Sequence, residues 1–259
     1  RASIEDALDL LQQPLSEDNK INDITKISFS KKIEFKNISF KYNENLPFVL
    51  ENINLTIPKG SKVGFIGKTG SGKSTFLDLA MGLLQPSIGE LLINDIRVSD
   101  FNCFSWQSHI SHVPQDIYLA DTSIAENIAL GEEHVDNKRI IQALRKSKLL
   151  DWANDLPNGI KTVVGEAGIR LSGGQRQRVA LARAFYFKRS VLVMDEATSA
   201  LDNKTEKEIV DEIHSIKGQM TIIVIAHRLS TVKYCDRIYR LDNGSIIQDG
   251  SYDQVIGKD

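Results

Sequence analysis

The sequence predicts an α/β protein with a mainly parallel sheet, an antiparallel β-rich beginning and an inserted helical part. Through the second half of the chain, short apolar runs of strand length alternate with segments of helical period. The 33–42 segment, IEFKNISFKY, instead alternates apolar and polar residues, as a half-buried strand pair does. Helical patterns dominate from 104 to 187, so we expect the helical insertion there.

The composition is ordinary for a globular protein. Of the 259 residues, 41% are apolar and 25% are charged, which is enough for a large core. The net charge is -2 and no long Lys/Arg block stands out, so we expect no nucleic-acid partner. Cys103 and Cys235 lie far apart, which favours a reducing compartment over a disulfide framework. No apolar run approaches the ~18 residues of a membrane span.

The expected elements follow from periodicity. Strands are expected at 52–57, 63–66, 90–93, 191–194 and 221–225, with two more short strands closing the chain. Helical spacing occurs at 3–11, 75–84 and 205–216, and in SIAENIAL, NKRIIQALRKSKLLDWAND and GGQRQRVALARAFYF. The polar 15–32 segment has the composition of a linker, and the start at Arg1 leads us to expect a piece of a longer protein.

A glycine-rich loop follows the apolar run 63–66. Residues 67–74, GKTGSGKS, fit the pattern G-x-x-x-x-G-K-[ST]. Between a strand and a helix, the backbone N–H groups of such a loop bind phosphates. We expect Lys73 to reach the β- and γ-phosphates and the Ser74 hydroxyl to bind Mg²⁺. The expected nucleotide contacts are Gly67, Lys68, Thr69, Gly70, Ser71, Gly72, Lys73, Ser74 and Thr75.

A second motif, VLVMDE, ends a predicted buried strand with two acids. Asp195, at the carboxyl edge of the sheet, suits a Mg²⁺ ligand beside the phosphate loop. Glu196, the next residue, could hold the attacking water as a general base. Two solvated acids at a strand end are common, so this motif gains its meaning from the loop at 67–74.

The third motif identifies a family. LSGGQRQR, residues 171–178, places Ser172 and two glycines at the start of an amphipathic helix. From about residue 33 to the C-terminus, the sequence resembles the ATP-binding cassette (ABC) family, whose core is a P-loop NTPase. LSGGQ is similar to the family's signature, SALD at 199–202 to its D-loop, and Gln115 in HVPQD to its Q-loop. His227 in AHR is similar to its switch histidine.

The resemblance implies roles for these residues. Tyr42 would stack on adenine, although a strand aromatic in the core is the alternative. Gln115 would meet Mg²⁺ and the water, and His227 would donate a hydrogen bond to the γ-phosphate. Each ATP would lie between two chains of a homodimer, in contact with the opposing signature. The signature residues expected there are Ser172, Gly173, Gly174 and Gln175.

Further resemblance points to exporters. TVVGEAGIRLSGGQ is similar to the stretch before the signature in exporters, where Glu166 would lie in a loop facing the membrane domain. We expect Phe101, Trp106 and the 117–119 segment to form a groove for a helix of that domain. By the same resemblance, residues 1–32 would be the end of the last membrane-domain helix and a linker, and residues 33–259 the nucleotide-binding domain.

The protein would then lie on the cytoplasmic face of a membrane, with a bacterial inner membrane expected. The alternative is a non-transport ABC ATPase that acts on nucleic acid or ribosomes. Against it, the stretch from Lys73 to Ser172 is too short for the coiled coil of chromosome-maintenance relatives, and the chain carries one cassette rather than two. The transported substrate stays open, since it is selected in the membrane domain.

Two groups of residues are expected to be structural. His109 and His112, with Cys103 nearby, have H-x-x-H spacing, but no second cluster completes a metal site. The arginines of the signature helix are expected on a solvated or interface face rather than on nucleic acid. They are Arg176, Arg178 and Arg183.

Overall fold

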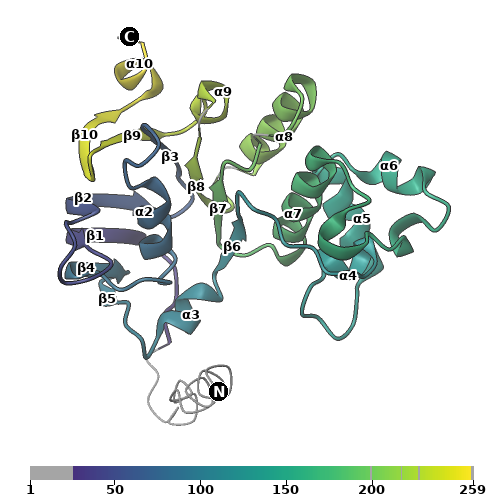
Figure 1. Ribbon diagram of the computed structural model, residues 1–259, viewed down its shortest axis with the longest axis horizontal. Helices are drawn as coiled ribbons and strands as arrows, with labels where there is room; N and C mark the ends of the chain where they lie inside the picture. The colour runs from purple at the N-terminus through teal and green to yellow at the C-terminus, as the bar shows by residue number, and fades with distance from the viewer. Residues whose placement is uncertain (1–25, 199, 217, 227, 258–259) are drawn as a thin grey trace, which may run out of the picture.

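The fold combines two β-sheets with a helical part at one side (Figure 1). The computed structural model describes residues 26–198, 200–216, 218–226 and 228–257. An antiparallel sheet and a mainly parallel sheet enclose the helix at residues 73–80, and the helices between residues 124 and 187 lie beyond the edge strand at residues 110–113. This arrangement confirms the predicted fold class.

The antiparallel sheet has the strand order β2-β1-β4-β5. Its strands are β1 (Lys32–Phe40), β2 (Leu50–Pro58), β4 (Ile88–Ile93) and β5 (Ile96–Arg97). The alternating segment that begins at 33 therefore forms one long strand rather than a strand pair. Ile33 and Phe35 point into the core while Lys36 is exposed, which accounts for the alternation.

The larger sheet has the strand order β10-β9-β3-β8-β7-β6. Its strands are β3 (Lys62–Ile66), β6 (Ile110–Val113), β7 (Val191–Asp195), β8 (Thr221–Ile225), β9 (Arg237–Asp242) and β10 (Ser245–Gly250). All neighbours pair in parallel except β9 and β10. The carboxyl ends of β3, β6, β7 and β8 consequently meet at one edge, where functional loops of such sheets gather.

Helix α2 (Lys73–Ala80) lies between the two sheets. Its Phe76 ring packs against Phe35 of β1 at 4.6 Å and against Phe65 of β3 at 4.2 Å, measured between ring centroids. All three rings are buried. The apolar contacts on both sides fix the start of α2, and with it the loop that joins β3 to α2.

The helical part contains α4 (Ile124–Ile128), α5 (Asn137–Lys146), α6 (Leu150–Asp155) and α7 (Gly173–Phe187), with short turns η1 (Gly159–Lys161) and η2 (Glu166–Gly168). It begins later than the predicted residue 104, because α3 (Cys103–Gln107) and β6 precede it and belong to the core. The helical pattern from 137 to 155 is two helices. Lys148, with φ of 57°, breaks it.

The remaining helices are α8 (Asn203–Ser215), α9 (Leu229–Val232) and α10 (Tyr252–Val255). None of the helices in the described ranges is both long and apolar enough to cross a membrane.

The expected linker is wrong at its C-terminal end. Ile27 and Phe29 are 2% and 5% exposed and belong to the core. Phe29 meets the Trp106 ring edge-on at 5.6 Å, and the Ile27 carbonyl lies 2.9 Å from Nε2 of His109. The core thus begins before residue 33. The helix predicted at 3–11 lies outside the described residues.

Candidate functional site

The loop between β3 and α2 has a backbone that only glycine fits comfortably. Gly72 has φ of 98°, and a Cβ there would lie 2.7 Å from Cδ2 of Leu50. Gly70 has φ of 82° but faces open space. The Ser71 hydroxyl is buried and makes no hydrogen bond to any described group. The loop therefore holds a fixed turn, with its tip open to a ligand and one polar group unused.

Lys73 is folded over this loop. Its Nζ donates to the carbonyl oxygens of Gly67 and Lys68 at 2.9 and 2.8 Å. Burial lowers the pKa of Lys73, while the negative charges of Glu196 and Asp195 oppose that shift. The ammonium group is thus held at the loop, with two carboxylates close enough to act on it.

The site gathers carboxylates. Burial raises the pKa of Asp195, and the charges of Glu196 and Asp78 raise it further, whereas Lys73 and a hydrogen bond from Ser74 lower it. Asp78, one turn after Ser74 on α2, also has its pKa raised by burial. Its position four residues after Ser74 on the same helix could have predicted that Asp78 lies beside Ser74. Three acids, Asp78, Asp195 and Glu196, thus lie at this edge of the sheet, an arrangement that favours binding of a cation.

Glu196 begins the loop that follows β7. Its φ of 50° is unusual for a residue with a side chain, and its N–H donates to the carbonyl of Ile225 at the end of β8. Parallel pairing of β7 with β8 brings about this contact. Glu196 and Gln115 line a cleft of about 400 Å³ together with the phosphate loop. The other lining residues are Val49, Thr69, Gly70, Gly72, Lys73, Ser74 and Thr75.

The signature segment lies elsewhere. Gly173 lines a separate cavity of about 660 Å³, to which Gln115 and Glu166 also contribute. None of the signature residues 171–175 lines the phosphate-loop cleft, although Gln115 lines both cavities.

Ser172 caps α7 in a way that leaves its hydroxyl proton free. Its Oγ accepts from the N–H of Gln175, and the Gln175 side chain accepts from the N–H of Ser172. Because Oγ is used as an acceptor, its own hydrogen can be donated outward. Gly174 faces the carbonyl of Ala200, to which a Cβ would come within 3.2 Å. The N–H groups of Ser172 and Gln175 are thus used within the cap, while the Ser172 hydroxyl can donate to a ligand.

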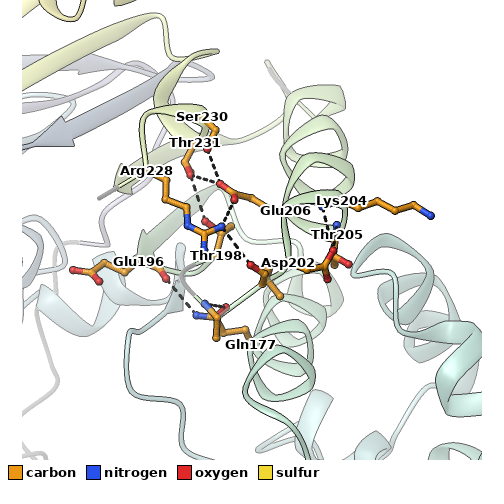
Figure 2. Close-up of polar contacts among 12 residues, drawn as sticks. Gln177, Glu196, Thr198, Asp202, Lys204, Thr205, Glu206, Arg228, Ser230 and Thr231 are labelled. Carbon is orange, nitrogen blue, oxygen red and sulfur yellow. Dashed lines mark hydrogen bonds and ion pairs between the residues drawn. The ribbon is translucent and has the colours of Figure 1, made fainter. Parts of the chain in front are cut away.

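A buried glutamine joins the signature helix to the loop of Glu196 (Figure 2). Gln177, 3% exposed, donates from Nε2 to the carbonyl of Glu196 at 3.4 Å and accepts from the N–H of Ala200 at 3.0 Å. Sequence reasoning did not find this residue, because a glutamine inside an amphipathic helix carries no sign of its partners.

Tyr42 lies just beyond β1 and is 58% exposed. The core alternative for this residue is therefore wrong. Its hydroxyl and that of Thr75 are 3.1 Å apart, and its ring meets Phe40 edge-on at 5.0 Å. The ring is thus held next to the C-terminal end of the phosphate loop, with much of its surface open.

The groove expected near α3 needs correction. Trp106 is fully buried, and its Nε1 donates to the Ala80 carbonyl at 2.9 Å. Leu119 is 1% exposed. Both belong to the core, since their apolar surface is taken up by packing. Phe101 and Tyr118, at 84% and 68% exposed, remain available, and the structure adds Phe104 at 67%.

The arginines of the signature helix make hydrogen bonds within the helical part. Arg176 donates to the Leu171 carbonyl, Arg178 to that of Lys148, and Arg183 to that of Asn127, at 2.8 to 2.9 Å. Burial lowers the pKa of Arg183. The three side chains are half-buried and tie neighbouring segments to α7, and the expectation of an interface face stays a prediction. His227 lies outside the described residues.

The match to a known family covers more than half of the chain. The sequence model described as ABC transporter matches residues 50–199, which include the phosphate loop, Gln115, the signature and Glu196. The chain belongs to the ABC transporter family. As the ATP-binding domain of that family, it binds ATP, and the cleft at the phosphate loop is where the family motif lies.

Similar members of the ABC transporter family are exporters. The chain is 39% identical over 256 residues to the ATP-dependent lipid A-core flippase of Saccharophagus degradans, covering 99% of this chain and 43% of the relative. It is 40% identical over 258 residues to the alpha-hemolysin translocation ATP-binding protein HlyB of Escherichia coli O157:H7, covering 99% and 36%. The chain therefore spans less than half the length of these relatives.

The structure is similar to that of a bacterial Atm1-family ABC exporter with ATP bound. The TM-score is 0.90 at 31% sequence identity, covering 99% of this chain and 45% of the other. The described fold is thus that of an exporter nucleotide-binding domain.

Proposed function

We propose that this chain hydrolyses ATP to drive export or flipping of a substrate across a membrane, as the nucleotide-binding part of an exporter-type ABC transporter. The observation that carries the proposal is the cleft shared by the phosphate loop, Gln115 and Glu196. The similarity to lipid and toxin exporters favours transport over the alternative of a nucleic-acid or ribosome ATPase.

In this proposal each residue acts on the phosphates or the water. Lys73 binds the β- and γ-phosphates, and these contacts replace its hydrogen bonds to the carbonyls of Gly67 and Lys68. Glu196 holds the attacking water and accepts its proton, and Gln115, which lines the same cleft, orients that water. His227 donates to the γ-phosphate, and Tyr42 stacks on the adenine ring.

The donor set fits a magnesium ion. Ser74 and Asp195 offer a hydroxyl and a carboxylate that already contact each other, and oxygen ligands of this kind suit Mg²⁺. The raised pKa of Asp195 beside two further acids indicates a place where a cation is favoured. When bound by Ser74, Asp195 and Gln115, Mg²⁺ would neutralise charge on the phosphate oxygens.

A homodimer completes the site in this proposal. Ser172, Gly173, Gly174 and Gln175 lie apart from the phosphate-loop cleft of their own chain, which supports contact with ATP on a second chain. A membrane domain, on the same polypeptide and upstream, would dock near the exposed Phe101 and Glu166. The domain would then work at the cytoplasmic face of the membrane. The substrate is left open, because in this proposal the membrane domain selects it.

Two activity measurements test this proposal. Glu196→Gln should keep ATP binding while hydrolysis is nearly abolished, because the amide is similar in shape but cannot act as a base. With ATP, size-exclusion chromatography should then show a dimer. A Glu196→Gln chain that turns over like the parent would remove Glu196 from the mechanism.

Sharing of sites between chains is tested by mixing. Lys73→Ala chains and Ser172→Arg chains should each be inactive alone, yet the mixed dimer keeps one intact loop facing one intact signature. Partial recovery on mixing, with activity per chain that rises with protein concentration, is expected. No recovery, and activity that stays flat on dilution, would show that each chain works alone.

A further inference from the structure

A buried carboxylate on α8 lies behind the catalytic loops and has no part in the proposed chemistry. Glu206 is 4% exposed and is within the first turns of α8. Three donors surround it: Nη1 of Arg228, the Ser230 hydroxyl at 2.7 Å and the Thr231 hydroxyl at 3.2 Å. A buried charge of this kind is tolerated only because it is paired and hydrogen-bonded. The carboxylate therefore holds Arg228, Ser230 and Thr231 together.

The hydrogen bonds of this cluster have a fixed direction. The hydroxyl of Thr231 has one proton, and a carboxylate can only accept, so that proton points to Glu206. The Thr198 hydroxyl, 3.3 Å from that of Thr231, must then be the donor in their contact. A relay thus runs from Thr198 through Thr231 to the carboxylate (Figure 2).

The two ends of the cluster lie at the two loops that carry the proposed chemistry. Thr198 is two residues after Glu196 on the loop that follows β7, and Arg228 directly follows His227 in the sequence. Arg228 also donates to the carbonyl of Leu201 at 3.3 Å, which ties the two loops directly. On the opposite side of the Glu196 loop, Gln177 holds the backbone from the signature helix. The loop is therefore held from both sides.

We propose that Glu206 is a positioning residue for ATP hydrolysis, which fixes the loop of Glu196 and the turn after His227 relative to each other. It acts through two arms. Its Oε1 holds Ser230 and Thr231, and through Thr231 also Thr198. Its Oε2 holds Arg228. The proposal rests on the proposed roles of Glu196 and His227.

Separate substitutions can remove the contact with Arg228 and the hydrogen bonds through Thr231. In Glu206→Gln, the amide oxygen can still accept from the hydroxyls, but its NH₂ group then faces the Arg228 guanidinium, donor against donor. In Thr231→Val, the hydroxyl relay to Thr198 is lost while the shape of the side chain is kept. Thr231→Ser keeps the hydroxyl and should restore the relay.

The experiment separates the rate of hydrolysis from the affinity for nucleotide, at a protein concentration where activity per chain has levelled off. For Glu206→Gln and Thr231→Val we expect kcat to fall by about 10- to 100-fold, since small displacements of catalytic groups have effects of that size. The dissociation constant for ATP should change less than about 3-fold, a bound we set because Glu206 and Thr231 do not line the phosphate-loop cleft. Thr231→Ser should hydrolyse ATP nearly as the parent does.

Asp211→Asn is the matched control, because it removes one negative charge from an exposed position on the same helix. It should leave both kcat and ATP affinity unchanged. Parental kcat in both Glu206→Gln and Thr231→Val would overturn the proposal. The proposal would also be overturned if ATP affinity fell by the same factor as kcat, because that result indicates a general structural role. If Glu206→Gln does not fold, Thr231→Val against Thr231→Ser decides. Failure of the proposed function is distinct, because the parent chain itself would then hydrolyse no ATP.

Discussion

Replacing Trp106 tests whether the region around α3 is core or docking surface. The side chain is fully buried, packs edge-on against Phe29 at 5.6 Å and donates to the Ala80 carbonyl at 2.9 Å. Trp106→Ala removes that packing and leaves a buried carbonyl without its donor. Changes of this kind lower the free energy of unfolding by about 3–5 kcal/mol. At about 2–4 °C for each kcal/mol, the melting temperature should fall by about 6–20 °C.

A matched comparison separates packing from the hydrogen bond. Trp106→Phe keeps most of the apolar surface but not the indole N–H, so a smaller loss of about 1–3 kcal/mol is expected. Phe104→Ala, two residues away and 67% exposed, should change the free energy of unfolding by no more than about 0.5 kcal/mol. Scanning calorimetry or urea unfolding measures all three. A Trp106→Ala chain as stable as the parent, or a Phe104→Ala chain equally destabilised, would refute this reasoning.

Two further predictions concern the cleft. Since the folded state raises the pKa of Asp195, the ionised carboxylate destabilises the fold at neutral pH, and this cost disappears as the pH falls and the group is protonated. Without nucleotide or metal, Asp195→Asn should therefore melt at a higher temperature than the parent at pH 7. The difference in melting temperature should become smaller towards pH 4. An Asp195→Asn chain that melts at or below the temperature of the parent at pH 7 would contradict this reasoning. Tyr42→Ala should weaken ATP and GTP alike by about 1–3 kcal/mol, since stacking has little base selectivity, whereas Tyr42→Phe should keep the affinity. Calorimetric titration measures this, and a loss confined to ATP would show that Tyr42 reads the purine edge.

Local patterns were enough to predict the parts of the site that come from single stretches of chain. The phosphate loop, the strand ending at Asp195 and the helix that starts after Ser172 follow from turn glycines, a buried run and helical period. Their arrangement at one sheet edge follows from parallel pairing. These features depend on neighbours in the sequence, or on a rule that holds for any parallel sheet.

Contacts between distant segments could not be predicted in this way. The aromatic character of Trp106 suits a groove and a core equally, and only its contacts with Phe29 and Ala80 decide between them. Gln177 and Glu206 are ordinary helix residues by composition, yet each meets a loop more than 20 residues away in the chain. Periodicity and motif spacing do not reveal which distant residues meet, because those pairings depend on the tertiary fold.

The strands of the large sheet divide the apolar interior. Ile223 and Ile225 of β8 pack in the cluster that includes α2, whereas Ile222 and Val224 pack in the cluster that includes α5 and α7. Strand β8 also lies between β3 and β7, so its backbone amides are covered on every side and should exchange with solvent only after a large opening of the core. The amides of α5 belong to a segment that contacts one cluster alone, and so can exchange by local opening of the helical part. Hydrogen exchange should thus divide the chain into a slow central sheet and a faster helical part.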